Sequence, residues 1–398
     1  GSSSFSLNGD IEGIRRALLY NGKVSAKVTL TGDSIDFNQL IKAAVAGSEY
    51  SSKSLVEKDS ISALVLDESN AIPINVDTVQ SGIFIVPRNL DVEFNSRIKN
   101  AKFADISIRD AMGRIILRNQ AIHLPQFRLN SDIGTASMTM VYKAANSKGA
   151  HIGLDLNVTE MNVKELIQGF PMIDELAPML RSFEGVVDSE MTAVTELDSV
   201  MNVLLPQTTA SCHMRGKNMV LLDGETFSEI SKTLMFKNKK RNLIDSISVE
   251  FIMEDEKLMI FPFQVSIDRY SAAVGGIQNL DMSFNYHITV LKSPLPFKLG
   301  LNITGDIDNM KIRLAKAKYK DLFTVAREKK LTETINVREE MVDKLRKSIN
   351  EIVSSDIRQP VNRPRVSLPD SLRNEFFRLD TTTVNVVMPV DSIDNGNQ

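Results

Sequence analysis

The chain has 398 residues, of which 42% are hydrophobic and 24% are charged, as is typical of folded protein. Its formal net charge of -3 provides no positive field, so we expect no nucleic-acid partner. Cys212 is the only cysteine, which excludes an internal disulfide and a zinc site built from cysteines. No run of about 18 apolar residues and no signal peptide is present, so we interpret the sequence as a soluble part of a longer protein.

The N-terminal residues predict a β module that is followed by an insertion. Residues 1–50 contain alternating apolar and polar positions and are interpreted as the end of a preceding β module with one short helix. Residues 51–78 carry no sustained period, and we expect a loop or an insertion there.

Strands dominate residues 79–316, where apolar and polar residues alternate with a period of two. This pattern indicates strands with one apolar and one polar face, and the turn-forming segments between them favour antiparallel meanders. We divide the region into a β-groove module with helices at 79–205 and a C-terminal β module at 206–316. The longest alternation runs from Leu280 to Val290 and predicts one long strand.

A weak internal repeat supports a sheet built from modules. The segment TLTGDSIDFNQLIK aligns with LDLNVTEMNVKELIQ, which makes Asp36 and Asn162 equivalent helix N-caps. A second internal similarity pairs two predicted strands that contain Pro125 and Pro262, where we expect a bend or an edge position. Repeated sheet modules are the economical interpretation.

Helices are expected at 37–47, 172–183 and 226–236, and a charged amphipathic helix is expected within 317–358. The tail at 359–398 is expected to be largely irregular. The apolar stripe of the amphipathic helix consists of Leu322, Val325, Met341, Leu345, Ile349 and Ile352.

Motifs that carry chemistry are missing. No G-x-S-x-G elbow, P-loop or HExxH motif is present, so we expect no catalytic site and no cofactor. Asp306 and Asp308 share a polar strand face, and we interpret them as turn carboxylates rather than a catalytic pair. Each histidine lacks a second ligand at metal spacing, so we expect strand residues with satisfied hydrogen bonds and no metal site. The histidines are His123, His151, His213 and His287.

Three glycines, Gly9, Gly32 and Gly305, stand on the apolar face of their strands. A missing side chain there lets a sheet bend sharply or leaves room for a molecule to lie against the backbone. Both interpretations fit a strongly curved sheet around an elongated apolar groove. The same alternation also describes a sandwich whose apolar faces bury one another, so the residues alone leave the groove and the closed core open.

The C-terminal module resembles a known family. The segment LDGETFSEISKTLMFKNKKRNLIDSISVEFIMEDEKLMIFPFQVSIDRYSAAVGGIQNLDMSFNYHITVL, followed by GLNITGDIDNMKIRL, is similar to the C-terminal region of AsmA-type proteins of Gram-negative bacteria. The apolar-x-Gly-x-apolar segment and turn that close the family pattern match residues 303–314, and LDVEFNSRIKNAKFADISIRD to VTEMNVKELIQ resembles another module. The likeness covers residues 1–316 and is one of pattern rather than of a catalytic signature.

The resemblance implies a mainly β fold with flanking helices. In it, an elongated, strongly curved antiparallel sheet of repeated modules forms an apolar groove, and a C-terminal helix is added. The resemblance also implies a periplasmic location, an inner-membrane anchor N-terminal to this sequence, and an architecture related to bridge-like lipid transfer proteins. Phospholipid or another acyl-chain lipid is the expected ligand, and outer-membrane assembly proteins are expected partners.

We therefore expect a non-enzymatic protein that shelters and conducts phospholipid and so supports outer-membrane assembly. Two alternatives stay open. One is a scaffold that binds envelope proteins through sheet edges and the C-terminal helix, and the other is an enzyme of unfamiliar type. The lipid-groove candidates are Val249, Phe251, Met253, Phe261, Phe263, Val265, Met282, Phe284, Tyr286, Ile288, Leu301 and Ile303.

Overall fold

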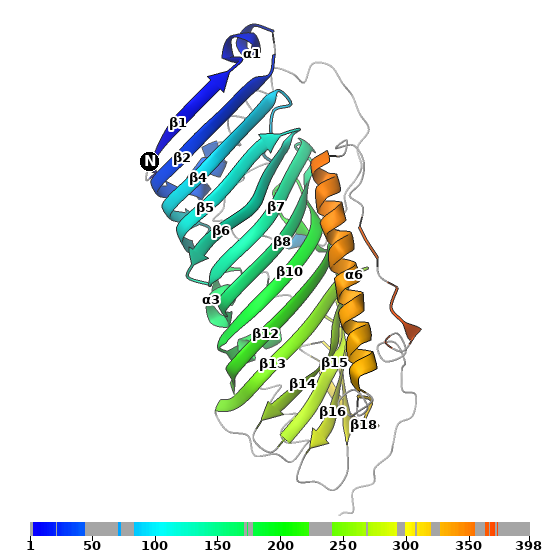
Figure 1. The fold of residues 1–398 in the computed structure, drawn as a ribbon. Helices are drawn as coiled ribbons and strands as arrows, with labels where there is room; N and C mark the ends of the chain where they lie inside the picture. The colour runs from blue at the N-terminus through cyan, green and yellow to red at the C-terminus, as the bar shows by residue number, and fades with distance from the viewer. Residues whose placement is uncertain are drawn as a thin grey trace, which may run out of the picture.

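The computed structural model places most of the described chain in one long, curved β-sheet (Figure 1). The mainly β, curved antiparallel fold class that the sequence predicts is confirmed. The residues that the structure describes are 3–20, 22–43, 71–72, 83–170, 173, 178–222, 241–267, 270–292, 299–306, 309–319, 327–354, 363–365, 367–370 and 372.

Eighteen strands join the sheet within these residues. They are β1 (Ser4–Glu12), β2 (Val24–Asp36), β3 (Ala71–Ile72), β4 (Leu90–Phe103), β5 (Ile106–Arg118), β6 (Ala121–Ser131), β7 (Thr135–Asn146), β8 (Gly149–Asn162), β9 (Phe183–Glu184), β10 (Val186–Leu197), β11 (Val203–Leu204), β12 (Thr209–Leu222), β13 (Arg241–Glu254), β14 (Lys257–Ile267), β15 (Tyr270–Asn279), β16 (Phe284–Lys292), β17 (Gly300–Gly305) and β18 (Lys311–Ala315). The helices with assigned bounds are α1 (Ile14–Tyr20), α3 (Val163–Gly169), the 3-10 helices η2 (Pro178–Ser182) and η3 (Leu205–Gln207), and α6 (Arg327–Ser354).

The long strands follow one another across the sheet almost in chain order. β4 to β8 form consecutive antiparallel pairs, β8 pairs with β10, and β10 pairs with β12. β12 to β18 again pair in sequence. Within the described residues, β1 pairs only with β2 and β18 pairs only with β17, so the sheet is open at both edges.

One pair of strands departs from the antiparallel order. β2 and β4 run parallel, with Val28 beside Phe94 and Gly32 beside Ile98. A parallel pair needs a crossover connection of about a dozen residues or more, and the chain between β2 and β4 is long enough. The predicted insertion at 51–78 lies outside the described residues except for β3, which pairs with β11.

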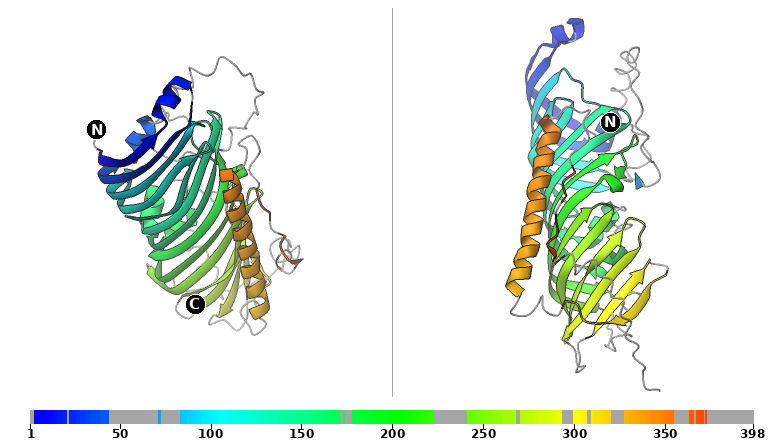
Figure 2. Two further views of the ribbon diagram at one scale, coloured as in Figure 1. Left: turned by 45° about the horizontal axis from the view of Figure 1, so that its top comes forward. Right: turned by 90° about the vertical axis from the view of Figure 1, so that its right-hand side faces the viewer.

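The residues of β8 serve to name the two faces of the sheet. We call the face that carries Leu154 and Leu156 of β8 the inner face, and the face that carries Gly153 and Asp155 the outer face, because successive side chains point to opposite sides. The inner face lies on the concave side of the curve, and α6 runs along the outside (Figure 2).

Proline-containing bulges interrupt two strands at equivalent places. The register between β6 and β7 shifts between Leu124 and Phe127, on either side of Pro125. In β14 the register to β15 shifts in the same way between Ile260 and Phe263, beside Pro262. Proline has no N–H to donate to the ladder, so an inserted residue at a bulge accommodates it. The predicted bend at both prolines is confirmed.

The two predicted helix caps are also confirmed. Asn162 Oδ1 accepts hydrogen bonds from two N–H groups in the first turn of α3, at 3.0 and 3.3 Å. Asp36 Oδ1 accepts one from the N–H of Gln39 at 3.2 Å, and the helix that follows is described as far as residue 43. Of the other predicted helices, 226–236 lies outside the described residues, and the described end of 172–183 forms η2.

The helix α6 packs its apolar stripe onto the outer face. Met341 and Leu345 are fully buried, and Ile349 and Ile352 are each 3% exposed, which confirms these four members of the predicted stripe. The other two predicted members lie outside the described residues. The stripe packs against Ala121, Val141, Val194, Ile252, Met259, Phe261, Leu368 and Leu372.

Polar contacts fix the position of α6 along the sheet. Arg346 Nε donates to Asp155 Oδ2 at 2.9 Å, and Thr192 of β10 donates to the other oxygen of the same carboxylate at 3.0 Å. Near the end of α6, the buried Lys143 donates to the carbonyl of Val353 at 3.5 Å. A cation is favourable at a helix C-terminus, so the sheet holds both the middle and the end of the helix.

We expect Gly153→Val to loosen α6. A Cβ at Gly153 would lie 2.7 Å from Ile349 Cγ1 and 3.3 Å from Ile349 Cα, so the helix would have to shift away. Overpacking of this kind costs about 1–3 kcal/mol, and thermal unfolding should show a lower Tm. Asn157→Val, at an exposed outer-face position of the same strand, is the control. An unchanged Tm for Gly153→Val would contradict this docking of α6.

Candidate functional site

A continuous row of residues crosses the inner face from β6 to β18. The cross-strand register places one inner-face residue of each long strand beside that of the next. We call this set the inner row: Phe127, Met138, Leu156, Met191, Cys212, Phe251, Ile260, Gly276, Tyr286, Ile303 and Ile312.

The middle of the inner face is apolar and only partly covered. Every inner-face residue that the register pairs on β7, β8, β10 and β12 is uncharged. Several of these side chains are methionines, which are flexible and adapt to irregular apolar shapes. From the partly exposed inner-face residues of these strands and of β13, we define the central stripe: Met138, Met140, Leu154, Leu156, Met191, Cys212, Met214 and Phe251.

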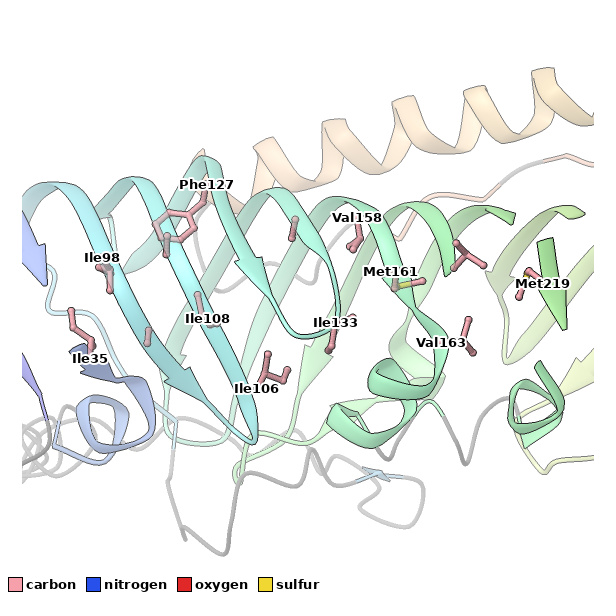
Figure 3. Close-up of a cluster of buried hydrophobic side chains, with 14 of the residues drawn as sticks. Ile35, Ile98, Ile106, Ile108, Phe127, Ile133, Val158, Met161, Val163 and Met219 are labelled. Atoms are coloured by element: carbon pink, nitrogen blue, oxygen red, sulfur yellow. The ribbon is translucent and has the colours of Figure 1, made fainter. Parts of the chain in front are cut away.

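Buried clusters border the central stripe on both sides. Along the α3 side, Ile133, Met161 and Val163 belong to a large buried cluster, and Figure 3 shows these side chains on the side of the strands away from α6. Along the opposite side, Tyr142 donates a hydrogen bond to the carbonyl of Phe84 at 2.9 Å. The central stripe therefore runs along the sheet between two packed borders.

The C-terminal end of the inner face is closed. Leu301 is fully buried, Ile303 is 4% exposed and Tyr286 is 6% exposed, and these side chains pack in one cluster. The Tyr286 hydroxyl donates to Gln278 Oε1 at 2.6 Å, which satisfies the one polar group of that ring. At β16–β18 the alternation therefore builds a closed core, one of the two interpretations that the sequence leaves open.

Most of the predicted groove residues lie on the inner face, but two do not. Phe261 is 1% exposed and packs under α6 on the outer face, because the bulge at Pro262 reverses the alternation. Met282 lies in the turn before β16 with a φ of 66°, so the long strand predicted from residue 280 begins only at Phe284. The residues that the register or their shared cluster places on the inner face are Val249, Phe251, Met253, Phe263, Val265, Phe284, Tyr286, Ile288, Leu301 and Ile303.

The register also places the three predicted glycines on the inner face, but the protein itself fills the space beside each of them. A Cβ at Gly32 would lie 2.7 Å from Ile35 Cδ1. Gly305 has a φ of 112° and approaches the carbonyl of Asn309, where Asp306 accepts a hydrogen bond from the Asn309 N–H at 2.8 Å. Gly305 thus ends β17, and Asp306 binds the backbone at Asn309, whereas the predicted partner Asp308 lies outside the described residues. Gly9 lies beside Val28 of β2, and a Cβ there would overlap the carbonyl oxygen of Lys27 and lie 2.8 Å from Val28 Cα.

The ionisable groups near α6 lie on the outer face. Arg338 of α6 faces two carboxylates, with Nη1 3.7 Å from Glu190 Oε2 and Nε 3.4 Å from Glu250 Oε2. His213 Nε2 lies 3.6 Å from Glu250 Oε1, and Arg215 pairs with Glu190 at 2.9 Å. Burial raises the pKa of Glu250 to about 7, although Arg338 opposes this shift.

The histidines all stand at outer-face positions. His287 contacts Asn302 Oδ1 at 2.6 Å and Thr289 Oγ1 at 3.0 Å, and His213 contacts Ser248 Oγ at 3.0 Å. Among the described residues, no group of three or more His, Cys, Asp or Glu side chains could hold a metal ion. In the same part of the chain, no helix combines the length and apolarity needed to cross a membrane.

Cys212 occupies the middle of the inner row, between Met191 and Phe251. Loss of hydration raises the pKa of its thiol to about 11, and Ser189 Oγ lies 3.5 Å from the sulfur. Because the thiolate is the reactive form, this cysteine is a weak nucleophile at neutral pH. The residues next to Cys212 in the sequence do not show that it belongs to the inner row. The alternation of inner-face and outer-face positions along residues 209–222 does place Cys212 on the inner face.

Comparisons with known proteins give no identification. No protein-family model, curated protein or solved structure matches this chain. The resemblance to AsmA-type proteins therefore stays a prediction, and the function has to be inferred from the inner face itself.

We expect Glu250→Gln to change how stability depends on pH. The pKa of Glu250 is about 7 in the folded protein against 4.5 for an ordinary glutamate, so the folded state holds a proton that the unfolded chain releases between these values. Glu250 therefore favours folding at low pH, and this contribution is lost as the pH rises toward 7.

We expect the unfolding free energy of the Glu250→Gln variant minus that of the wild type to rise by about 2 kcal/mol from pH 5 to pH 8. Denaturant titration of both proteins at each pH measures this difference. Glu93→Gln, on β4, controls for removal of an outer-face carboxylate elsewhere. A constant difference between wild type and Glu250→Gln across this range would show that the carboxyl is not desolvated beneath α6.

Proposed function

We propose that the inner face of this sheet binds the acyl chains of phospholipid and shelters them from water, without catalysing a reaction. Following the family resemblance, we place this activity in the periplasm, in a protein anchored to the inner membrane. There it would conduct lipid and support outer-membrane assembly together with partner proteins.

The central stripe is the observation that carries the proposal. Its side chains are uncharged and partly exposed, and they continue from strand to strand along the sheet. Covering acyl chains is worth about 0.8 kcal/mol per CH₂, so a two-chain lipid with roughly 30 methylenes requires on the order of 20 kcal/mol of apolar cover. An extended apolar surface supplies such cover, whereas a small pocket does not.

A scaffold that binds protein partners is the second candidate, and the edge at β1 favours it. Within the part of the chain that the structure describes, this strand pairs with β2 alone, and it exposes Phe5, Leu7 and Ile11 by 46%, 52% and 55%. Edge strands of this kind accept a strand from another chain. The apolar stripe of α6 is already buried against the sheet, so a scaffold would use the edges rather than that stripe.

Photo-crosslinking at two adjacent residues of β8 tests the lipid proposal. Leu156 is a partly exposed member of the central stripe, and Asn157 is its exposed neighbour on the outer face. A photoreactive residue at position 156 should form lipid adducts in cells of the source organism, and one at position 157 should form few or none. Silence at position 156 in the folded protein would overturn lipid binding on the central stripe.

A charge on the central stripe should displace the lipid. We expect Leu156→Glu and Met191→Glu to lower the amount of phospholipid that co-purifies with the protein by roughly five-fold or more, because a carboxylate beside acyl chains loses its hydration. Asn157→Glu adds the same charge to the outer face and should leave the lipid content unchanged. Extraction followed by mass spectrometry measures the lipid, and equal content in all three variants would contradict the proposal.

A further inference from the structure

The end of the molecule at α1 exposes an unusual concentration of large apolar side chains. On β1, the inner-face residues Leu7 and Ile11 are 52% and 55% exposed. On α1, Ile14 is 49% exposed, Leu19 60% and Tyr20 81%. In Figure 1, α1 projects beyond the ends of the strands at the β1 edge.

The helix α1 is too short to be stable by itself in water. Isolated helices of fewer than about 12 residues are marginal, and α1 has seven. In proteins, such helices are held by packing of an apolar face, yet Ile14, Leu19 and Tyr20 of α1 are exposed. A covering surface would remove this mismatch.

The arrangement of charges indicates the chemistry of that surface. At about 100° per residue, Arg15 and Arg16 flank Leu19 on the helix circumference, with Tyr20 next to Arg16. Both arginines are exposed, as are the carboxylates of Asp10 and Glu12 at the adjoining end of β1. A groove in a partner protein would favour a purely apolar face. The boundary between lipid headgroups and acyl chains instead favours apolar side chains next to cations and a tyrosine.

We propose that α1, together with the adjoining end of β1, inserts into the headgroup region of a lipid bilayer that contains anionic phospholipid. Leu19 and Tyr20 enter the acyl boundary, and the guanidinium groups of Arg15 and Arg16 bind headgroup phosphates. From α1, the exposed Ile11 and Leu7 lead onto the inner face, and a lipid that follows this path from the bilayer reaches the central stripe past the buried inner-face side chains of β2 to β6. This path rests on the proposed function, whereas the membrane contact does not.

A tryptophan at position 20 tests the contact directly, because the chain has no tryptophan of its own. Tyr20→Trp should show a blue-shifted emission with vesicles of phosphatidylcholine and phosphatidylglycerol, and brominated lipids should quench it. Binding to pure phosphatidylcholine vesicles should be roughly ten-fold weaker or more, since each arginine adds to the attraction for anionic lipid. Arg15→Gln with Arg16→Gln in the same background should remove this preference.

Val200→Trp is the matched control. Val200 is 53% exposed in the turn between β10 and β11, so a tryptophan there reports general adhesion of apolar residues to vesicles. We expect no shift at position 200. No shift at position 20, or equal shifts at both positions, would overturn the proposal. A blue shift at position 20 that appears without vesicles and grows with protein concentration would also overturn it, because a second copy would then cover α1.

The two proposals can fail separately. A vesicle-induced shift in the Tyr20→Trp variant, with no lipid adduct at position 156, would keep the membrane contact and remove the lipid path. Lipid adducts at position 156 without a shift in the Tyr20→Trp variant would keep the lipid-binding face and overturn the membrane contact.

Discussion

The backbone ladder fixes each side chain to one face of the sheet, and the inner face depends on this register being kept from strand to strand. A slip of one residue in β8 would replace Leu154 and Leu156 by Gly153 and Asp155 and put a carboxylate in the central stripe. The outer face makes such a slip costly. Asp155 is bound there by both Arg346 and Thr192, so the polar contacts of one face hold the apolar residues on the other.

The packing of α6 depends on the same register. Beneath α6, the outer face carries the apolar side chains of Val194 and Ile252, and Gly153 has no side chain. Without the helix, this strip of the outer face would be exposed to water. By covering the strip, α6 removes this apolar part of the outer face from water. It also joins several strands from outside, which supports a curved sheet whose concave side is incompletely filled.

The sequence predicted the parts of this arrangement that are local. Alternation identifies strands because side chains point to opposite faces at every step, and Asp36 and Asn162 cap helices through contacts a few residues away. Phe261 was assigned to the wrong face because one inserted residue at Pro262 reverses the alternation, although the proline itself was noticed. The parallel pairing of β2 with β4 depends on a crossover that the alternation does not reveal. Whether an apolar face is open or closed was equally inaccessible, since it depends on how far distant strands curl toward one another.

Burial along the inner face is lowest at the β1 edge and in the middle, and this bears on both proposals. Leu7 of β1 is 52% exposed, Ile98 of β4 and Phe127 of β6 are buried, the central stripe is partly exposed, and Leu301 of β17 is fully buried. An ordinary sandwich would bury its middle most deeply, because the centre of a packed layer is farthest from water. Here the middle is less buried than the strands on either side of it, as expected of a face that takes up a ligand there. A lipid that moves between α1 and the central stripe would therefore have to pass the buried side chains of β4 to β6.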